Sequence, residues 1–527
     1  MDIVLPHPPQ VLRHHSSRAR DIWRASRRFE RWAIVLLSTI GLLDLGHRFW
    51  PKWAMPGAFD DDFFYYAQVA RHLAQGMGST FDGIHRTNGY HPLWLLCLTA
   101  FAWIGGGRFF FILVTLVTAV SLASVFVLTL QILRRLGVSP AGQYVVASLI
   151  TFQAELLLQG GMEVVLALPL LLLLLRVFLE ATELDGWFYL RCGALASLCV
   201  LARLDSVLLV GLLFALGLRE LGSWQRTIKA SFAFGAGLTP VWVYLWLNKV
   251  WFGGWMPISA QAKELRLHHT PQFAPLLALV HPLTTVRLLV AIPGALCAVV
   301  LAGLLWTRGG ELSARTRALL WTLALFPAVY FGLLCMLSDW PLWYWYFYPL
   351  VLACTGCCAA LSVWLRPCER VWAMLALGLT MVSLGYRAAY NRSHPPSKNP
   401  LFLAARDVAN FAESHPGIYA MGDRGGTVAY LMNSPTIQLE GLMMDRAYLK
   451  RLQERSPLDA VLREYGVRYY VSTDATLKDS CYITREPLES GPDSAYMAGR
   501  ICTEPLATFS HDRFVTRIFD VGAARQH

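Results

Sequence analysis

The stretch DDDFFYYAQVARHLAQGMGSTFDGIHRTNGYHPLW, residues 60–94, begins with three consecutive acids, Asp60, Asp61 and Asp62, just after the first apolar segment of a very hydrophobic chain. Ionised carboxylates beside a lipid bilayer are costly, and those that persist there commonly serve a function. The acids also open an amphipathic pattern, which predicts a helix from the aspartates to about Gln75. Residues 60–94 are therefore our first candidate for a functional site.

The composition is that of a membrane protein. The chain has 527 residues, of which 55% are hydrophobic and 15% charged, and its mean hydropathy is +0.43. A soluble domain carries about 25% charged residues, so the deficit predicts an α-helical polytopic protein surrounded by membrane lipid. The net charge is +11, but the arginines lie in the N-terminal arm and in short connections between apolar runs. We therefore expect no nucleic-acid partner.

Apolar runs long enough to cross a bilayer, about 17 to 25 residues each, occur about eleven times. The run at 188–202 and the run at 206–219 are separated by two charged residues, and they could instead form one hairpin that crosses only part of the bilayer. The predicted membrane-spanning helices begin near Trp32, Phe109, Ser139, Val164, Phe188, Ser206, Ala230, Leu288, Ala318, Tyr346 and Val371.

The basic residues orient these helices. If the N-terminus is cytoplasmic, alternate connections are basic, as the positive-inside rule requires. The apolar run 93–104 is too short to cross and would invert this pattern, so we interpret it as a helix along the membrane surface. We predict a cytoplasmic arm at 1–31, then a transmembrane region at 32–389 in the cytoplasmic membrane, with a first outer loop at 51–108. The basic connections contain Arg134 and Arg135; Arg176 and Arg191; Arg219, Arg226 and Lys229; Arg308, Arg315 and Arg317; and Arg366 and Arg370.

A change of character near residue 390 marks a second region. Residues 390–400, YNRSHPPSKNP, form a polar, proline-rich linker. Four apolar runs with the pattern of strands follow, GIYAMGD, TIQLEG, VRYYVSTD and RIFDVG, with helix-like stretches between them. We predict a small α/β domain at 390–527, which the odd number of spans places outside the cell. Cys481 and Cys502 lie in this domain, and we expect them to form a disulfide there.

The three aspartates have two interpretations. Aspartate is a favoured N-cap, and acids in a first helical turn suit the helix dipole. A carboxylate at a membrane face, in a partly apolar pocket, can also act as a general base toward a hydroxyl. Adjacent positions of a helix point in different directions, so the three acids cannot all share one task. Their setting favours a catalytic role for Asp61 or Asp62.

Further polar residues recur in the predicted outer loops. Some stand in the loop FDGIHRTNGYHPLW, which could bind a sugar or a phosphate but would also serve as a structured turn, and a single histidine there is more often structural than a ligand. Arg203 and Asp205 could simply pair with each other. A transporter would instead place polar groups near the middle of the membrane. The candidate binding residues are Arg86, Asn88, His91, Glu163, Arg203, Asp205, Lys263 and Tyr344.

These motifs together resemble a known family. The pattern comprises DDFFYY at 61–66, Ala70 and Arg71, GMGSTFDG at 76–83 and TNGYHPLW at 87–94, with GME at 161–163, RLD at 203–205, FG at 252–253, Pro257, AK at 262–263 and IQLEGL at 437–442. It is similar to the GT-C integral-membrane glycosyltransferases, which include protein O-mannosyltransferases and arabinofuranosyltransferases, and most closely to a bacterial branch. The resemblance covers most of the chain.

The resemblance implies a GT-C fold and a sugar transfer from a polyprenyl-phosphate donor to a hydroxyl of a glycan, lipid or protein acceptor. Asp61 would be the base, the reaction would invert the sugar, and Lys263, Arg86 and Arg203 are candidates to stabilise the leaving phosphate. No cofactor is required, although carboxylate oxygens suit Mg²⁺ or Mn²⁺. We expect no dedicated metal site, because Cys354, Cys357 and Cys358 lie inside a span and are interpreted as packing. The alternative is a non-catalytic transporter or lipid-handling protein.

Overall fold

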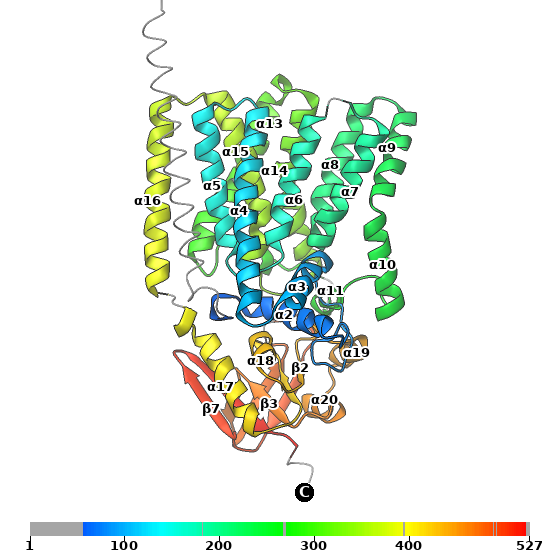
Figure 1. The fold of residues 1–527 in the computed structure, drawn as a ribbon, viewed down its shortest axis with the longest axis vertical. Helices are drawn as coiled ribbons and strands as arrows, with labels where there is room; N and C mark the ends of the chain where they lie inside the picture. The colour runs from blue at the N-terminus through cyan, green and yellow to red at the C-terminus, as the bar shows by residue number, and fades with distance from the viewer. Residues whose placement is uncertain are drawn as a thin grey trace, which may run out of the picture.

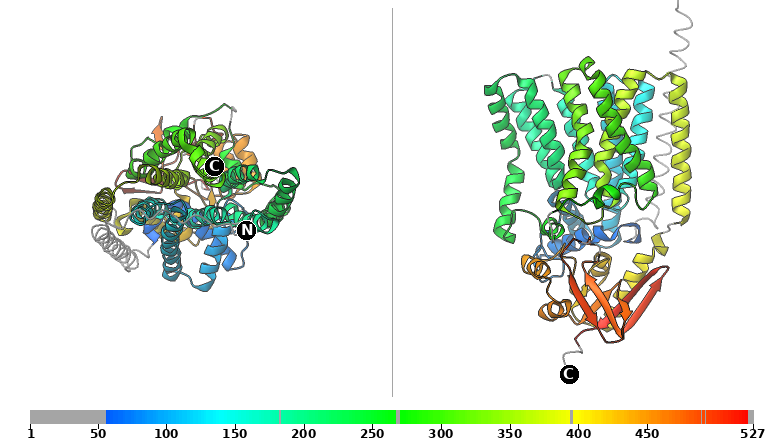
Figure 2. Two further views of the ribbon diagram at one scale, coloured as in Figure 1. Left: turned by 90° about the horizontal axis from the view of Figure 1, so that it is seen from above. Right: turned by 180° about the vertical axis from the view of Figure 1, so that it is seen from behind.

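A computed structural model describes residues 56–181, 183–266, 270–393, 396–488, 490–491 and 493–522. These residues form a helical bundle, a layer of short helices across one end of it, and an α/β region beyond that layer (Figures 1 and 2). The predicted arm at 1–31 and the span predicted to begin near Trp32 lie outside the described residues.

The bundle contains a helix at each predicted span after the first. Among the described residues, five helical segments are long and apolar enough to cross a membrane, and a pair bent by 54° between Gly237 and Thr239 would be a sixth. The five are Arg108–Arg135, Pro140–Leu158, Arg287–Glu311, Ala314–Leu337 and Tyr344–Leu365. The chain is a multi-pass membrane protein. The bundle helices are α4 (Arg108–Arg135), α5 (Pro140–Leu158), α6 (Val164–Glu180), α7 (Gly186–Ala202), α8 (Val207–Leu218), α9 (Trp224–Gly237), α10 (Thr239–Phe252), α13 (Ile292–Arg308), α14 (Ala314–Leu337), α15 (Tyr348–Leu365) and α16 (Glu369–Ser393).

The basic connections lie together at the end of the bundle away from the α/β region (Figure 1). Arg135 Nε lies 3.3 Å from Glu180 Oε1, which joins the last turns of α4 and α6. Arg315 Nε lies 3.5 Å from Glu220 Oε2, which joins the start of α14 to the connection after α8. The ends of the described helices thus alternate as the arginine pattern predicts.

Short helices form the layer at the opposite end (Figure 1): η1 (Pro56–Ala58), α2 (Asp61–Ala74), α3 (Pro92–Ile104) and α11 (Ile258–Lys263). The predicted amphipathic helix is confirmed, because α2 begins at Asp61 and has Gln75 as its C-cap. The run 93–104 forms α3, with Pro92 at its first turn. Phe63 and Phe64 of α2 are fully buried between the bundle and the α/β region.

The C-terminal region is a small α/β structure, as predicted. Its main sheet has the order β2-β1-β3-β8-β7, in which β1 pairs in parallel with β2 and β3, and β8 runs antiparallel to β3 and β7. A second antiparallel sheet has the order β4-β5-β6. The elements are α17 (Pro400–Ser414), β1 (Tyr419–Met421), α18 (Gly425–Leu431), β2 (Thr436–Gln438), α19 (Arg446–Gln453), α20 (Leu458–Glu464), β3 (Tyr469–Ser472), β4 (Thr476–Lys478), β5 (Cys481–Glu486), β6 (Met497–Ile501), β7 (Ala507–His511) and β8 (Phe514–Asp520).

The four predicted strand runs contain β1, β2, β3 and the second half of β8, whereas β4 to β7 were not predicted. All residues of β1, β2 and β3 are buried, including the polar Thr436 and Gln438 of β2 and Ser472 of β3. In β4 every residue is exposed, and in β6 exposed residues interrupt the buried ones. The predicted disulfide between Cys481 and Cys502 is confirmed.

Candidate active site

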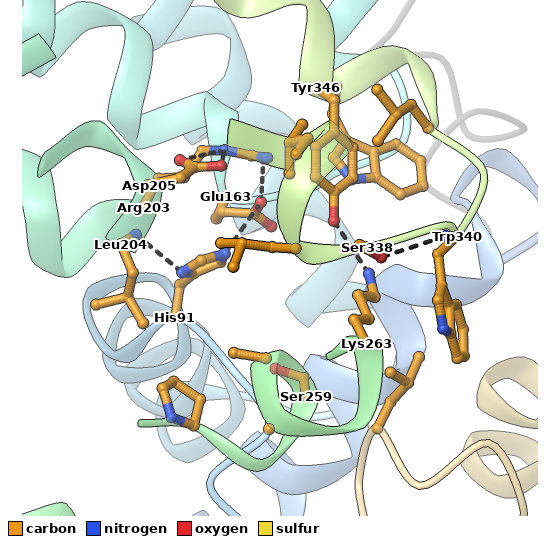
Figure 3. A pocket seen from close by; sticks show the side chains of 18 of the residues that line it. His91, Glu163, Arg203, Leu204, Asp205, Ser259, Lys263, Ser338, Trp340 and Tyr346 are labelled. Atoms are coloured by element: carbon orange, nitrogen blue, oxygen red, sulfur yellow. Dashed lines mark hydrogen bonds and ion pairs between the residues drawn. The ribbon is translucent and has the colours of Figure 1, made fainter. Parts of the chain in front are cut away.

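A cavity of about 320 Å³ lies where the bundle, the layer of short helices and the α/β region meet. Its walls come from α2, from the loop before α3, from the break between α7 and α8, from α11, from the end of α14 and the loop after it, and from the segment after β2 (Figure 3). Most of the wall is apolar, and its charged groups are concentrated in two clusters around Arg203 and Lys263.

Arg203 is the centre of a buried ion cluster. The chain leaves α7 at Arg203, and this break turns its guanidinium, which is 1% exposed, toward the bundle. Nη1 donates to Glu163 Oε1 at 2.5 Å and Nε donates to Asp205 Oδ1 at 2.9 Å. The hydroxyls of Tyr330 and Tyr348 donate to Asp205 at 2.8 and 3.0 Å. Burial raises the pKa of Asp205, but the charges of Arg203 and His91 and the hydrogen bonds from Arg203 and Tyr330 together hold that pKa below its ordinary value. The predicted pairing of Arg203 with Asp205 is confirmed.

His91 supports the Arg203 cluster through both of its ring nitrogens. The backbone N–H of Leu204 donates to His91 Nδ1 at 3.1 Å, so in the neutral ring the proton is on Nε2, which lies 3.6 Å from Glu163 Oε1. Burial lowers the pKa of His91 and favours this neutral form. The Tyr66 hydroxyl donates to the other oxygen of Glu163 at 3.3 Å. His91 and Tyr66 therefore connect α2 and the loop before α3 to the Arg203 cluster.

Lys263 faces the cavity from the last turn of α11 (Figure 3). Its Nζ donates to the Tyr346 hydroxyl at 3.0 Å and stands 5.7 Å from the ring centroid of Trp340. Burial lowers the pKa of Lys263, but Tyr346, Asp62 and Glu440 together hold it above its ordinary value. The lysine is therefore a charged ammonium at the wall of the cavity.

The three aspartates face three different surroundings. Asp60 accepts a hydrogen bond from the Tyr344 hydroxyl, and burial raises the pKa of Asp60 to about 6. Asp61 points toward the α/β region, where it accepts from Gly426 N at 3.0 Å, Thr427 N at 2.8 Å and Thr427 Oγ1 at 2.7 Å. Burial raises the pKa of Asp61, and these hydrogen bonds oppose that rise. Of the three, Asp62 lines the cavity.

The other candidates divide between the cavity and its supports. Glu163, Arg203, Asp205, His91 and Lys263 come together at the cavity. Asn88, Arg86 and Tyr344 are not part of its wall. Asn88 Oδ1 accepts from Ile258 N at 3.0 Å and fixes the start of α11. Arg86 is exposed, and Tyr344 holds Asp60.

Sequence analysis missed several residues of the wall. Tyr65 and Tyr66 line the cavity beside Asp62, which the sequence had already named as a candidate, and the spacing of i, i+3 and i+4 places the three side chains on one face of α2. That spacing was a usable signal. Ser259 and Met443 also line the cavity, and no local pattern distinguishes them from other loop residues.

Across the part of the chain that the structure describes, no three His, Cys, Asp or Glu side chains are grouped so that they could hold a metal ion.

No protein-family model matches this chain, and no curated protein sequence does either. Solved structures do match. ArnT from Cupriavidus metallidurans in the apo state is 14% identical, with 92% of this chain and 97% of ArnT covered and a TM-score of 0.54. The chain has the GT-C fold. The arabinofuranosyltransferase AftD from Mycobacteria is 15% identical, with 93% of this chain and 40% of AftD covered and a TM-score of 0.50. ArnT bound to undecaprenyl phosphate gives 14% identity, 82% and 80% coverage and a TM-score of 0.44.

The GT-C fold was the expectation raised by the sequence motifs, and it is confirmed. At these identities the likeness concerns the arrangement of the helices and not the individual residues. The chemistry must therefore be argued from the cavity itself.

Proposed function

We propose that this chain is a membrane glycosyltransferase that moves a sugar from a polyprenyl-phosphate donor to an acceptor hydroxyl, with inversion, and that Asp62 is the general base. The observation that carries the proposal is one cavity at the end of the bundle with a carboxylate, Asp62, and an ammonium, Lys263, in its wall. AftD, an arabinofuranosyltransferase, has the same fold. A fold alone does not specify chemistry, so the cavity supplies the rest of the argument.

The apolar part of the cavity suits a lipid-linked donor. Leu333 and Leu337 of α14 and Val207 of α8 line it and are 40%, 40% and 52% exposed, so they also belong to the outer surface of the bundle. A polyprenyl chain can lie against this surface while its phosphate reaches Lys263. The sugar would then extend toward Asp62.

The reaction needs one base and one stabilising charge. Asp62 takes the proton of the acceptor hydroxyl as its oxygen attacks the anomeric carbon. The bond between that carbon and the phosphate oxygen breaks, and the phosphate leaves with the electron pair. Lys263 stabilises the developing negative charge. A direct displacement inverts the anomeric carbon and requires a single carboxylate, unlike the pair used by glycosidases.

The surroundings of the aspartates lead us to propose Asp62 as the base in place of Asp61. The Asp61 carboxylate accepts three hydrogen bonds from Gly426 and Thr427. These donors occupy both oxygens of the carboxylate and hold Asp61 toward the α/β region, away from a substrate in the cavity. Asp62 instead borders the space where a substrate would bind. Arg203 is matched by Glu163 and Asp205, so we propose that it supports the cavity and that Lys263 contacts the phosphate.

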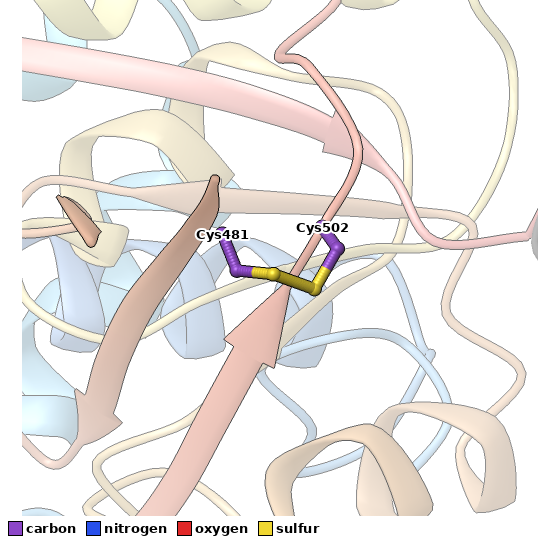
Figure 4. Close-up of a disulfide and its surroundings, with 2 residues drawn as sticks. All are labelled: Cys481 and Cys502. Atoms are coloured by element: carbon purple, nitrogen blue, oxygen red, sulfur yellow. A yellow bond between two sulfur atoms is a disulfide. The ribbon is translucent and has the colours of Figure 1, made fainter. Parts of the chain in front are cut away.

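We propose that the cavity faces the outside of the cytoplasmic membrane, with region boundaries at 1–31, 32–389 and 390–527. The basic connections support a cytoplasmic position for the opposite end of the bundle. The disulfide between Cys481 and Cys502 (Figure 4) supports an oxidising compartment for the α/β region. The acceptor would be a hydroxyl of a glycan, lipid or protein that reaches the cavity from this side.

The test is a transfer assay with purified protein in lipid nanodiscs and a panel of polyprenyl-phosphate sugars, with released lipid phosphate as the readout. Asp62→Asn should still bind donor and should lose about 10²–10⁴-fold in turnover, which is the usual contribution of a general base. Asp61→Asn is the matched control and should lose less. Full turnover by Asp62→Asn would exclude it as the base.

The alternative, a transporter or lipid-handling protein, predicts a different outcome. Such a protein would move a labelled lipid-linked sugar between the leaflets and release no lipid phosphate with any donor. Polar groups of a transporter commonly lie near the membrane midplane, whereas the charged residues of this cavity lie at the end of the bundle, beside the layer of short helices. That position favours the enzyme.

A further inference from the structure

The α/β region contacts α2 on both sides of Asp62. One position before it, Asp61 accepts three hydrogen bonds from Gly426 and Thr427 at the start of α18. Three positions after it, the Tyr65 hydroxyl donates to Glu440 Oε2 at 3.0 Å. Both contacts join residues that are more than 350 positions apart in the chain. The first turns of α2 are therefore held by the α/β region at two points, with Asp62 between them.

The contact between Tyr65 and Glu440 belongs to a buried hydrogen-bond network. Glu440 is 4% exposed, and Gln438 Nε2 donates to the same Glu440 oxygen at 2.8 Å. Gln438 belongs to β2, the edge strand of the main sheet, and its Oε1 accepts from Leu442 N at 3.0 Å. A buried network whose members are all hydrogen-bonded restricts the side chains that take part in it. The position of Tyr65 is thereby linked to the sheet.

The same segment also closes the cavity. Leu442 and Met443, just after Glu440, are part of its wall. The Leu442 carbonyl packs so closely on Gly89 that a Cβ added to Gly89 would lie 1.8 Å from the carbonyl oxygen. The α/β region therefore contributes part of the cavity wall.

We propose that Glu440 and Thr427 are positioning residues for Asp62. This inference rests on the proposed function, because it assigns them a task in the transfer reaction. Thr427 acts through Asp61, and Glu440 acts through Tyr65. Together they set the rotation and height of the first turns of α2, and hence the distance from the Asp62 carboxylate to the acceptor hydroxyl. A displacement of about 1 Å in such a geometry can cost 10²-fold in rate.

Two conservative variants weaken the two contacts without removing bulk: the first deletes the hydrogen bond to Glu440, and the second deletes one of the three hydrogen bonds to Asp61. Tyr65→Phe keeps the ring and deletes the hydroxyl that Glu440 holds. Thr427→Val keeps the shape and deletes the Oγ1 donor to Asp61. We expect the double variant to lower kcat and kcat/KM equally, by about 10²-fold, with an unchanged KM for the donor, because an interaction that acts only in the transition state has this signature.

The matched control is Tyr470→Phe. Tyr470 is a buried tyrosine like Tyr65, but it belongs to the α/β region. Its hydroxyl donates to Glu486 Oε1 at 2.9 Å, away from the cavity wall. This variant loses a hydrogen bond of the same kind, so it measures the general cost to the fold. Its kcat should equal that of the unmodified protein. Thermal unfolding would show whether Tyr65→Phe, Thr427→Val and Tyr470→Phe are equally folded.

A second comparison isolates the action through Asp62. In an Asp62→Asn background, Tyr65→Phe and Thr427→Val should produce no further loss, since coupled residues are non-additive. The inference would be overturned if the double variant were as active as Tyr470→Phe, or if its loss persisted in the Asp62→Asn background. Neither result would contradict the proposed function, provided that Asp62→Asn has lost its turnover. Full turnover by Asp62→Asn would instead contradict the proposed base.

Discussion

Successive side chains of a helix point about 100° apart, so Asp60, Asp61 and Asp62 face different parts of the molecule. Asp60 meets Tyr344 of the bundle, Asp61 meets the first turn of α18, and Asp62 meets the cavity. One run of identical residues thus supplies a contact to the bundle, a contact to the α/β region and a candidate base.

Lys263 should be the principal contact of the donor phosphate. Lys263→Met keeps most of the side-chain bulk and removes the charge, so turnover should fall by about 10²–10³-fold, as it does when one oxyanion donor is removed elsewhere. The measurement is release of lipid phosphate at saturating acceptor. Lys249→Met on α10 is the control, because Lys249 is exposed and donates only to Gly253 O at 3.3 Å in its own turn. Equal turnover of the two variants would remove Lys263 from the reaction.

Glu486 should make the stability of the α/β region depend on pH. Burial raises the pKa of Glu486 from 4.5 to about 8, so the folded region holds a proton that the unfolded chain releases. Its contribution favours folding below about pH 4.5 and is lost progressively as the pH rises toward about 8.

In Glu486→Gln this dependence should be absent, because glutamine does not titrate. The pH dependence of stability can be measured by thermal unfolding of both proteins between pH 5 and pH 8, with hydrogen exchange used to monitor the α/β region. A parallel response of the two proteins to pH would contradict the assignment to Glu486.

The start of α18 is built for close contact with α2. A Cβ added to Gly426 would lie 2.3 Å from the backbone oxygen of Asp61, and backbone cannot yield as a side chain can. Glycine at this position lets the two helices approach closely enough for the Asp61 hydrogen bonds. The adjacent Gly425 is not restricted in this way, since its nearest neighbour would be Met421 Cβ at 3.7 Å.

Gly426→Ala should therefore force the α/β region away from α2. We expect a loss of about 1–3 kcal/mol in the free energy of unfolding, as for other overpacked sites, together with faster proteolysis in the linker at 390–400. Gly425→Ala is the control and should be neutral or slightly stabilising. Equal proteolysis rates for the two variants would show that the contact between α18 and α2 is not close in solution.

The α/β region lies at one end of the bundle and the basic connections at the other (Figure 1), and the residues that line the cavity belong to the end with the α/β region. We expect an alkaline phosphatase fused after Gln526 to be active, because that enzyme folds only outside the cytoplasm, and the same fusion after Gly310 to be inactive. The positive-inside rule predicts both results. An inactive C-terminal fusion with an active fusion at Gly310 would place the cavity in the cytoplasm.

Much of this architecture could be predicted from local sequence. An apolar run is recognised by its own length, and the orientation of a span by the arginines next to it. The helix that begins at Asp61 is recognised by acids in its first turn and by an amphipathic pattern, and β1, β2 and β3 by short runs with apolar residues between turn residues. The strands β4 to β7 lack such a signal, because a strand in contact with solvent carries polar residues that also suit a loop.

The assignment of the aspartates depended on the tertiary structure. The sequence left Asp61 and Asp62 as candidates, because both stand in the first turn of the same helix, and the resemblance to the family favoured Asp61. The partners that turn Asp61 away from the cavity, Gly426 and Thr427, lie 365 and 366 residues further along the chain. No local pattern encodes a contact of that range. It arises because the packing of the α/β region against α2 determines that Asp61 contacts Gly426 and Thr427 and that Asp62 faces the cavity.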